Sequence, residues 1–133
     1  MERIAMRMTQ ESDYALRIVY YLANTNEERV GASVIATAQE IPLRFTLKIL
    51  RKLNAAGITK AYRGVTGGYA LSRPAKEISY KDVIEAVEGN IHINKCLGEN
   101  AHCNRNAMEY CKVHKKLLKI QKMLTEQLEN TRF

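Results

Sequence analysis

Apolar residues recur three and four positions apart in several stretches of the chain, which is the spacing of one helix face. The first stretch predicts a helix over residues 9–23, with Thr9 as its cap. A short helix over 33–39, capped by Ser33, is expected next. Pro42 then breaks the pattern, because proline disfavours helix in the residue before it.

A third helix follows at once over residues 43–56 and ends near Gly57, the residue type that favours the left-handed position after a helix. Its expected buried stripe consists of Phe45, Ile49, Leu50 and Leu53. Two short helices joined by a tight break, the second one basic, are typical of a helix-turn-helix. An ordinary helical hairpin is the alternative.

Two short alternating runs, residues 58–62 and 69–72, are rich in strand formers and predict a β-hairpin. The tip between them is basic and glycine-rich. Glycines 64, 67 and 68 permit positive φ and let backbone N–H groups approach a phosphate. A hairpin of this kind beside a helix-turn-helix is a wing.

Ser79 and Asp82 predict the capped start of a further helix that ends at Gly89. Residues 90–106 lack periodicity and are expected to form a loop. A long helix is expected from residue 107 to 130, with a seam of Tyr110, Val113, Leu117, Ile120 and Leu124. This seam suits pairing with a second copy, although packing against its own domain is the alternative.

These elements predict a mainly α fold with a small β-hairpin wing, a winged helix-turn-helix followed by a long C-terminal dimerisation helix. The chain divides into a DNA-binding domain (1–89), a cysteine-bearing loop (90–106) and a dimerisation helix (107–133). Its 133 residues suffice for one domain.

The 21 Lys and Arg against 14 Asp and Glu give a net charge of +7. Between Arg44 and Lys76 there are basic residues and no acid: Arg44, Lys48, Arg51, Lys52, Lys60, Arg63, Arg73 and Lys76. This placement favours a polyanion, because neutralised phosphates release counterions. A solvated basic surface is the alternative.

The chain has no stretch approaching the roughly 20 apolar residues that span a bilayer, and its start lacks the features of a signal peptide. We therefore expect a cytoplasmic protein with no membrane partner. No small-molecule substrate is expected either.

The wing and the helix after it, residues 63–89 (RGVTGGYALSRPAKEISYKDVIEAVEG), and the start at residues 6–17 (MRMTQESDYALR) carry a specific resemblance. The chain resembles the bacterial winged-helix transcription regulators typified by the iron-sulfur cluster regulator, the nitrite-sensitive (nitric oxide) repressor and the cysteine-metabolism repressor. Residues 1–5 are then an extra lead or an upstream start. The expected DNA contacts are Arg44, Phe45, Lys48, Arg51, Tyr62, Arg63, Gly64, Gly67 and Gly68.

Three cysteines, Cys96, Cys103 and Cys111, lie close together in the chain, and there are no others. An odd count argues against a set of structural disulfides. Gaps of six and seven residues between them are unlike the short pairs of zinc sites, so an iron-sulfur cluster fits better. A zinc site with three Cys and one His is the alternative.

The resemblance implies that the three cysteines hold the cluster. Either His114 or Asp13 of the partner subunit would supply the fourth ligand, to a two-iron or a four-iron cluster respectively. Nitric oxide, redox state or iron-sulfur supply would then change DNA affinity. Without a cluster, the thiols themselves are expected to act as a redox switch.

Three functional classes compete: a DNA-binding regulator, an enzyme with a Cys and His pair, and an assembly partner that uses the long helix. The sequence has no phosphate-binding loop and no nucleophile elbow. An enzyme would also leave the acid-free stretch unexplained. We expect a dimeric repressor on a palindromic operator, with a cluster-free thiol-sensing or metal-sensing regulator as the alternative.

Overall fold

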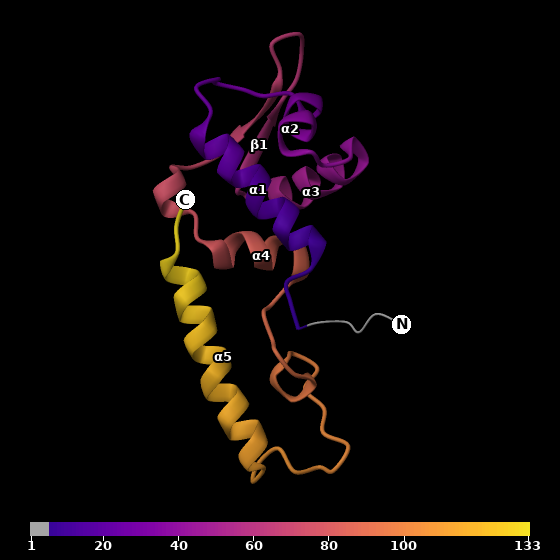
Figure 1. Ribbon diagram of the computed structural model, residues 1–133, viewed down its shortest axis with the longest axis vertical. Coiled ribbons are helices and arrows are strands. Elements are labelled where there is room, and N and C mark those ends of the chain that lie inside the picture. The colour runs from indigo at the N-terminus through magenta and orange to yellow at the C-terminus, as the bar shows by residue number, and fades with distance from the viewer. Residues whose placement is uncertain (1–5) are drawn as a thin grey trace.

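The computed structural model describes residues 6–133, which form a mainly helical fold with one two-stranded hairpin (Figure 1). The predicted fold class is confirmed. Residues 1–5, expected to be an extra lead and included in the 1–89 domain, lie outside the described residues. The elements are α1 (Gln10–Asn24), α2 (Ala32–Gln39), α3 (Leu43–Ala55), β1 (Thr59–Tyr62), β2 (Gly68–Leu71), η1 (Ala75–Glu77), α4 (Tyr80–Glu88), η2 (Lys95–Leu97) and α5 (Lys112–Asn130).

Helix α1 begins where its sequence predicts. The Thr9 hydroxyl accepts a hydrogen bond from the Ser12 backbone N–H at 3.1 Å, which satisfies one free donor of the first turn. Glu11 and Asp13 place negative charge at the positive end of the helix dipole. The opposite face, including Ile18 and Val19, is fully buried.

Helix α2 begins one residue before the predicted Ser33 cap. Gly31 is the N-cap, in an extended conformation and without a side-chain bond, so the prediction of Ser33 as the cap is wrong. Glycine is tolerated at this position, and the helix extends back to it. Glu40 ends the helix in the left-handed region (φ 53°), before the predicted break at Pro42.

Helix α3 buries Ile49, Leu50 and Leu53, as predicted, but its first turn differs. Phe45 is 38% exposed, so its assignment to the buried stripe is wrong. Thr46 occupies the buried position, because its hydroxyl donates to the Pro42 carbonyl at 3.2 Å and needs no water.

Strands β1 and β2 pair antiparallel, with Tyr62 opposite Gly68. A third segment joins β2 near the turn of the hairpin, because Val30 and Tyr69 exchange two backbone hydrogen bonds at 2.9 and 2.7 Å. Gly68 permits this approach, since a Cβ there would lie 2.8 Å from the Val30 backbone. The wing is therefore fixed to the loop between α1 and α2.

The core lies where α1, α3 and α4 meet the base of the wing. Helix α4 begins with the predicted capping box: the Ser79 hydroxyl accepts from the Asp82 N–H, and the Asp82 carboxylate accepts from the Ser79 N–H, both at 3.0 Å. It ends at Gly89, with φ 83°. Val83 is buried against the core.

Helix α5 begins at Lys112, five residues later than predicted. Ala107 is buried and its carbonyl accepts from the N–H groups of Tyr110 and Cys111, which makes a turn in place of the expected first helical turns. Cys111 is the N-cap, so Tyr110 does not belong to the helical seam. None of the residues of α5 is buried in the single chain.

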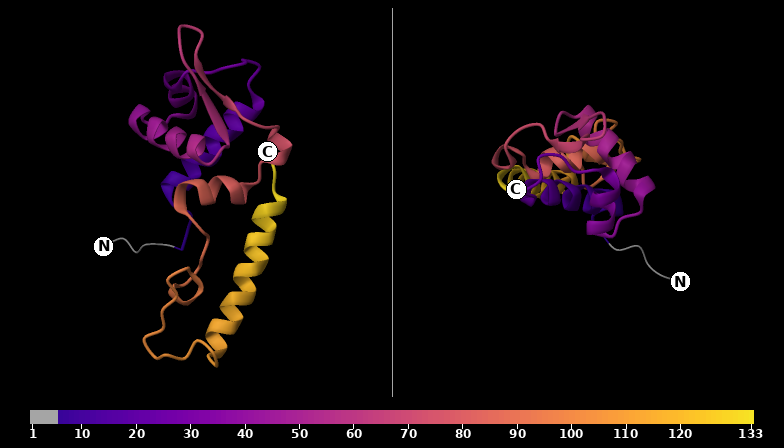
Figure 2. Two further views of the ribbon diagram at one scale, coloured as in Figure 1. Left: turned by 180° about the vertical axis from the view of Figure 1, so that it is seen from behind. Right: turned by 90° about the horizontal axis from the view of Figure 1, so that it is seen from above.

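The far end of α5 returns to α4. The Tyr80 N–H donates to the Thr131 carbonyl at 2.9 Å, and the Phe133 ring stacks on Tyr80 with centroids 4.8 Å apart. Figures 1 and 2 show that the wing and the loop before α5 lie at opposite ends of the molecule. No helix within residues 6–133 has the length and apolarity to cross a membrane.

Candidate nucleic-acid interface and thiol pocket

Three of the expected DNA contacts share one face of α3. Arg44, Lys48 and Arg51 are exposed, and their spacing of four and three residues aligns them on the helix surface. The Lys48 amino group lies 4.0 Å from the Glu11 carboxylate, at the limit of an ion pair. This face presents positive charge at the helix that follows the tight break of the helix-turn-helix.

Phe45 lies next to this basic face. Its ring meets the edge of Tyr14 with centroids 6.4 Å apart, and the Arg44 guanidinium carbon lies 5.8 Å from its centre. An exposed aromatic ring beside cationic groups suits contact with a sugar or a thymine methyl group. The exposure of Phe45 is therefore incompatible with the predicted buried stripe but compatible with the predicted contact with DNA.

The wing tip places Arg63 and Gly64 in solvent, next to a fully exposed Val65. Gly64 has φ 97°, and a Cβ added to it would meet no atom within 4 Å. The tip therefore presents open backbone and one guanidinium group, the combination expected of a hairpin that follows a groove.

Of the next two glycines, Gly68 adopts the positive φ that the sequence predicted and Gly67 does not. Gly67 does not adopt positive φ; a Cβ there would lie 2.3 Å from the Tyr62 carbonyl oxygen, so glycine closes the turn. Gly68 has φ 143° and packs on Val30. Both shape the hairpin, and their contact with DNA stays a prediction.

Arg29 is a basic residue that the sequence did not single out. Its guanidinium carbon lies 3.8 Å from the centre of the Tyr62 ring, which is cation–π distance. It comes from the loop between α1 and α2 and follows two glutamates in sequence, so no local signal marks it. The contact extends the basic surface along the side of the wing.

Besides Lys48, two cations of the acid-free stretch are paired with acids from elsewhere in the chain. The Lys52 amino group lies 2.7 Å from the Glu11 carboxylate, and an Arg73 guanidinium nitrogen lies 3.3 Å from the Asp82 carboxylate. The stretch lacks acids in sequence but not in space, which reduces the charge left for a polyanion.

All three thiols line one pocket of about 370 Å³ in the thiol segment, which we define as residues 90–111. The lining includes Cys96, Cys103 and Cys111 together with His102 and His114. Each cysteine is half-buried and unpaired. The three cysteines thus share one pocket, and their role as ligands stays a prediction.

The imidazole of His114 faces Cys96, since its Nδ1 lies 3.0 Å from the Cys96 Sγ. The predicted helix from residue 107 would include Cys111 as well as His114, whereas in the structure Cys111 is the N-cap and precedes the helix. Both residues nevertheless line the pocket. His114 therefore approaches the cysteine most distant from it in sequence.

Local donors favour the thiolate at two of the three cysteines. The backbone N–H of Ala107, 3.4 Å from the Cys103 Sγ, lowers the pKa of that thiol, and Arg105 assists. At Cys111, the backbone of His114 at the start of α5 lowers the pKa, with a smaller contribution from the charge of Arg105. Arg105 was not singled out from the sequence.

Asp13 lies on the first turn of α1 and pairs with Arg17 at 2.6 Å. It lines a separate hollow with Arg7, Met8, Thr9 and Gln10. Its predicted role involves a partner subunit, so its place in the single chain leaves that role a prediction.

The donor chemistry of the pocket suits an iron-sulfur cluster, since it combines three thiols and an imidazole and favours thiolate at two of them. The side chains share the pocket without converging on one point: within residues 6–133, no three Cys, His, Asp or Glu side chains are close enough to hold a single metal ion. The segment would have to close around a bound group.

Comparison with known proteins gives the class. The sequence matches the Rrf2 family, described as an iron-dependent transcriptional regulator, over residues 8–133. The chain belongs to the Rrf2 family. The resemblance to winged-helix regulators is thereby confirmed, and this Rrf2 protein is a helix-turn-helix regulator of transcription and not an enzyme.

Named relatives of this Rrf2 protein are also described as transcription regulators. A Haemophilus influenzae protein described as an HTH-type transcriptional regulator is 36% identical over 82% of the chain and 71% of its own length. The HTH-type regulator NsrR of Bacillus licheniformis is 31% identical, over 74% of the chain and 70% of its own. The match spans 59% of a Rhizobium meliloti relative, protein aau3.

Solved structures share the fold. IscR of T. potens superposes with a TM-score of 0.76 at 22% identity, covering 96% of the chain and 83% of IscR. CymR of B. subtilis, a global cysteine regulator, gives 0.75 at 19% identity, covering 96% and 93%. At these identities the likeness concerns the fold of the Rrf2 protein, including its wing and long terminal helix.

Proposed function

We propose that this Rrf2 protein is a homodimeric repressor that binds a palindromic operator in the cytoplasm, and that the thiol pocket controls its affinity for DNA. The observation that carries the proposal is the pairing of two candidate sites in one chain. Helix α3 and the wing lie at one end, and the thiol segment lies at the other (Figure 1). The exposed face of α3 is basic, and all three thiols line one pocket in the thiol segment.

The DNA-binding proposal assigns α3 to the major groove and the wing to the neighbouring backbone. Arg44, Phe45, Lys48 and Arg51 would contact the groove, because they form the exposed face of α3. Tyr62, Arg63, Gly64, Gly67 and Gly68 belong to the wing, where Arg63 and Gly64 reach the furthest into solvent.

The dimer proposal rests on α5. The helix is 19 residues long and leaves Val113, Ile120, Met123 and Leu124 exposed in the single chain. Apolar side chains at such spacing are covered in a stable protein by another helix. A two-fold dimer would set two α3 helices at the separation that a palindrome requires.

For the pocket, we propose that Cys96, Cys103 and Cys111 hold an iron-sulfur cluster with one further ligand. His114 is favoured as that ligand by its contact with Cys96, and the partner subunit's Asp13 is the other candidate. A bound cluster would supply iron that reacts with nitric oxide or oxygen and that is lost when iron is scarce. The chain itself would contribute the ligand side chains, of which Cys111 stands at the N-cap position of α5.

The second candidate is a regulator that senses through its thiols, or through zinc, without a cluster. The lowered pKa values of Cys103 and Cys111 favour it, since thiolates are the reactive form. An oxidised form of CymR from Staphylococcus aureus is a structural neighbour, with a TM-score of 0.69 at 22% identity.

Anaerobic purification tests the choice. A coloured protein with iron and sulfide in equal amounts, which loses colour in Cys103→Ala, supports the cluster; a colourless protein that contains zinc or no metal rules it out. Comparing His114→Ala with Asp13→Ala for retained iron identifies the fourth ligand. DNA affinity is then measured for loaded and stripped protein on a duplex that the wild-type protein selects from a random-sequence library.

A further inference from the structure

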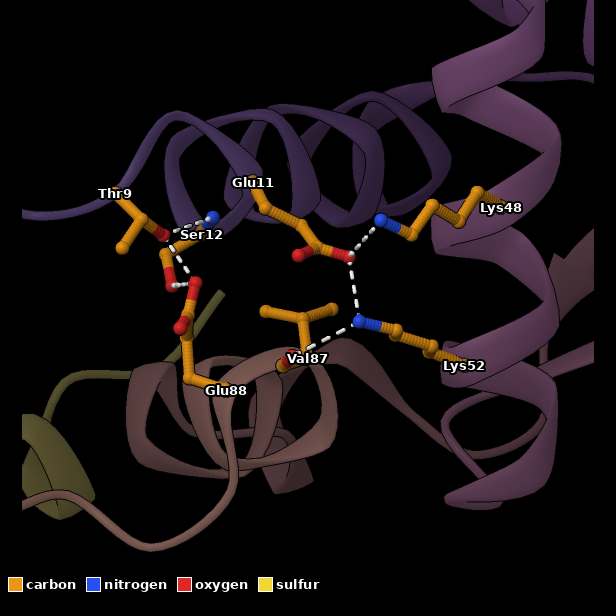
Figure 3. Close-up of polar contacts among 7 residues, drawn as sticks. All are labelled: Thr9, Glu11, Ser12, Lys48, Lys52, Val87 and Glu88. Carbon is orange, nitrogen blue, oxygen red and sulfur yellow. Dashed lines mark hydrogen bonds and ion pairs between the residues drawn. The ribbon is translucent and has the colours of Figure 1, made fainter.

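Lys52 differs from the other cations of α3 because its amino group donates two hydrogen bonds to other helices of the protein. Its amino group donates to the Glu11 carboxylate at 2.7 Å and to the backbone carbonyl of Val87 at 3.2 Å (Figure 3). Its side chain is 35% exposed, against 55% for Lys48 on the next turn. One side chain of α3 is thus bonded to α1 and to α4 at the same time.

A second tie holds the same ends of α1 and α4 together. The Glu88 carboxylate accepts from the Thr9 hydroxyl and lies 3.4 Å from the hydroxyl of the buried Ser12 (Figure 3). Thr9 also caps α1, so its hydroxyl serves both helices. The last turn of α4 is therefore fixed to the first turn of α1.

These contacts lie between the two candidate sites. Val87 and Glu88 are the last residues before Gly89, after which the thiol segment begins. On the other side, α3 carries Arg44 and Lys48 on its exposed face. A polar junction of α1, α3 and α4 thus separates the DNA-binding face from the chain that leads to the cysteines.

We propose that Lys52 is a positioning residue for DNA binding: through Glu11 and the Val87 carbonyl it fixes α3 against α1 and the end of α4, and it does not itself contact DNA. This inference rests on the proposed function of α3. The Val87 carbonyl lies in the last turn of α4, where carbonyl groups lack a donor within the helix and carry partial negative charge, which favours a cation there. Movement of Lys52 to a phosphate would break both bonds.

Salt dependence separates positioning from contact, because each lost phosphate contact reduces the slope of log affinity against log salt by about one. Lys52→Met is expected to lower affinity about tenfold with the slope of the wild-type protein. Lys52→Arg, which keeps both donors, restores the affinity. Unchanged affinity, or a slope reduced by about one, in Lys52→Met overturns the inference.

Glu11→Gln gives a second test through the sign of its effect. Loss of an acid near DNA raises affinity if charge alone matters, whereas loosening of Lys52 lowers it. We expect lower affinity, while Glu126→Gln on the exposed face of α5, a matched loss of one acid, has little effect. Raised affinity in Glu11→Gln contradicts the positioning role, and this variant also serves if Lys52→Met does not fold.

Lys48→Ala, measured on the same duplex, keeps the two proposals apart. A lower affinity with a slope reduced by about one supports the DNA-binding face. If Lys48→Ala has no effect while Lys52→Met still weakens binding at constant slope, the assigned face is wrong and the role of Lys52 stands.

Discussion

The winged-helix end and the thiol segment are held together by different kinds of contact. Around α3, Ile49, Leu50 and Leu53 are fully buried, and the neighbouring helices α1 and α4 are capped by the side chains of Thr9 and Ser79. In the thiol segment, Ala107 is the one buried side chain, and two hydrogen bonds join the segment to side chains of α5: Cys96 with His114, and the Ile93 N–H with the Gln121 amide oxygen. Burial therefore specifies the first region, whereas the second depends on a few polar contacts.

This difference bears on function. A region that buries a core keeps its shape whatever it binds, which suits a surface that must match DNA. A segment with little burial opens at low free energy and rearranges around a bound group. The sensor proposal requires that property of the thiol segment.

The largest expected difference between the regions is in stability. Leu50→Ala removes a fully buried side chain and should lower the free energy of unfolding by about 2–5 kcal/mol. Leu97→Ala, in the thiol segment, should lower it by under about 1 kcal/mol, because that side chain is only half-buried. Urea unfolding at one protein concentration measures both. Equal losses would show that the thiol segment belongs to the core.

Two glycines of the wing differ in the space around them and should therefore differ in how much stability an alanine costs. Gly68→Ala forces a Cβ to within 2.8 Å of the Val30 backbone at φ 143°, and should reduce stability by about 1–3 kcal/mol. Gly64→Ala has the strain of φ 97° but open space, so a loss near 1 kcal/mol is expected. Thermal unfolding of the two variants tests the order, and a larger loss at Gly64 contradicts it.

The exposed Arg63 side chain at the wing tip should matter for DNA binding and not for stability. Arg63→Ala is expected to weaken DNA binding about fivefold and to reduce the salt slope by about one, since one phosphate contact is lost. Lys76→Ala removes an equal charge from η1 and serves as the control. The two variants are compared by fluorescence anisotropy, and equal losses in both would mean that only net charge counts.

The smallest expected effect concerns pH. Backbone donors hold the pKa of Cys103 and Cys111 below that of an unfolded thiol, so their stabilisation is complete above the unfolded pKa and is lost as pH falls through the folded pKa. Alkylation by iodoacetamide should therefore reach half its maximal rate at lower pH in the folded protein than in urea.

Arg105→Met should shift that midpoint slightly upward at both cysteines, because the charge of Arg105 favours both thiolates. Lys95→Met, beside Cys96, is the matched control. Site-resolved mass spectrometry follows each thiol, and a midpoint that is equal in folded and unfolded protein refutes the lowered pKa values.

Features fixed by neighbouring residues were predictable from the sequence. The Thr9 cap, the box of Ser79 and Asp82, and Gly57 after α3 each depend on hydrogen bonds or φ values within one turn. The helix-turn-helix and the wing follow from such signals in series. The closeness of the three cysteines in sequence likewise placed them in one segment.

Features fixed by distant residues were not predictable. The pattern extended α5 back to residue 107, but Ala107 is buried in a turn and Cys111 is the N-cap, so the helix begins later, at Lys112. The contact of Arg29 with Tyr62 and the bond from Lys52 to Val87 join separate elements. No periodicity within one element carries that information.

Because Thr131 and Phe133 contact Tyr80, the thiol segment and α5 together form a closed loop of chain that leaves the end of α4 and returns to its start. Because both ends of this loop are fixed to α4, the thiol segment can change in length at little cost in stability. Doubling the length of a flexible loop adds only about 0.6 kcal/mol of closure entropy. Cysteine spacing can therefore change in such a chain without disturbing the helices that carry the DNA-binding face.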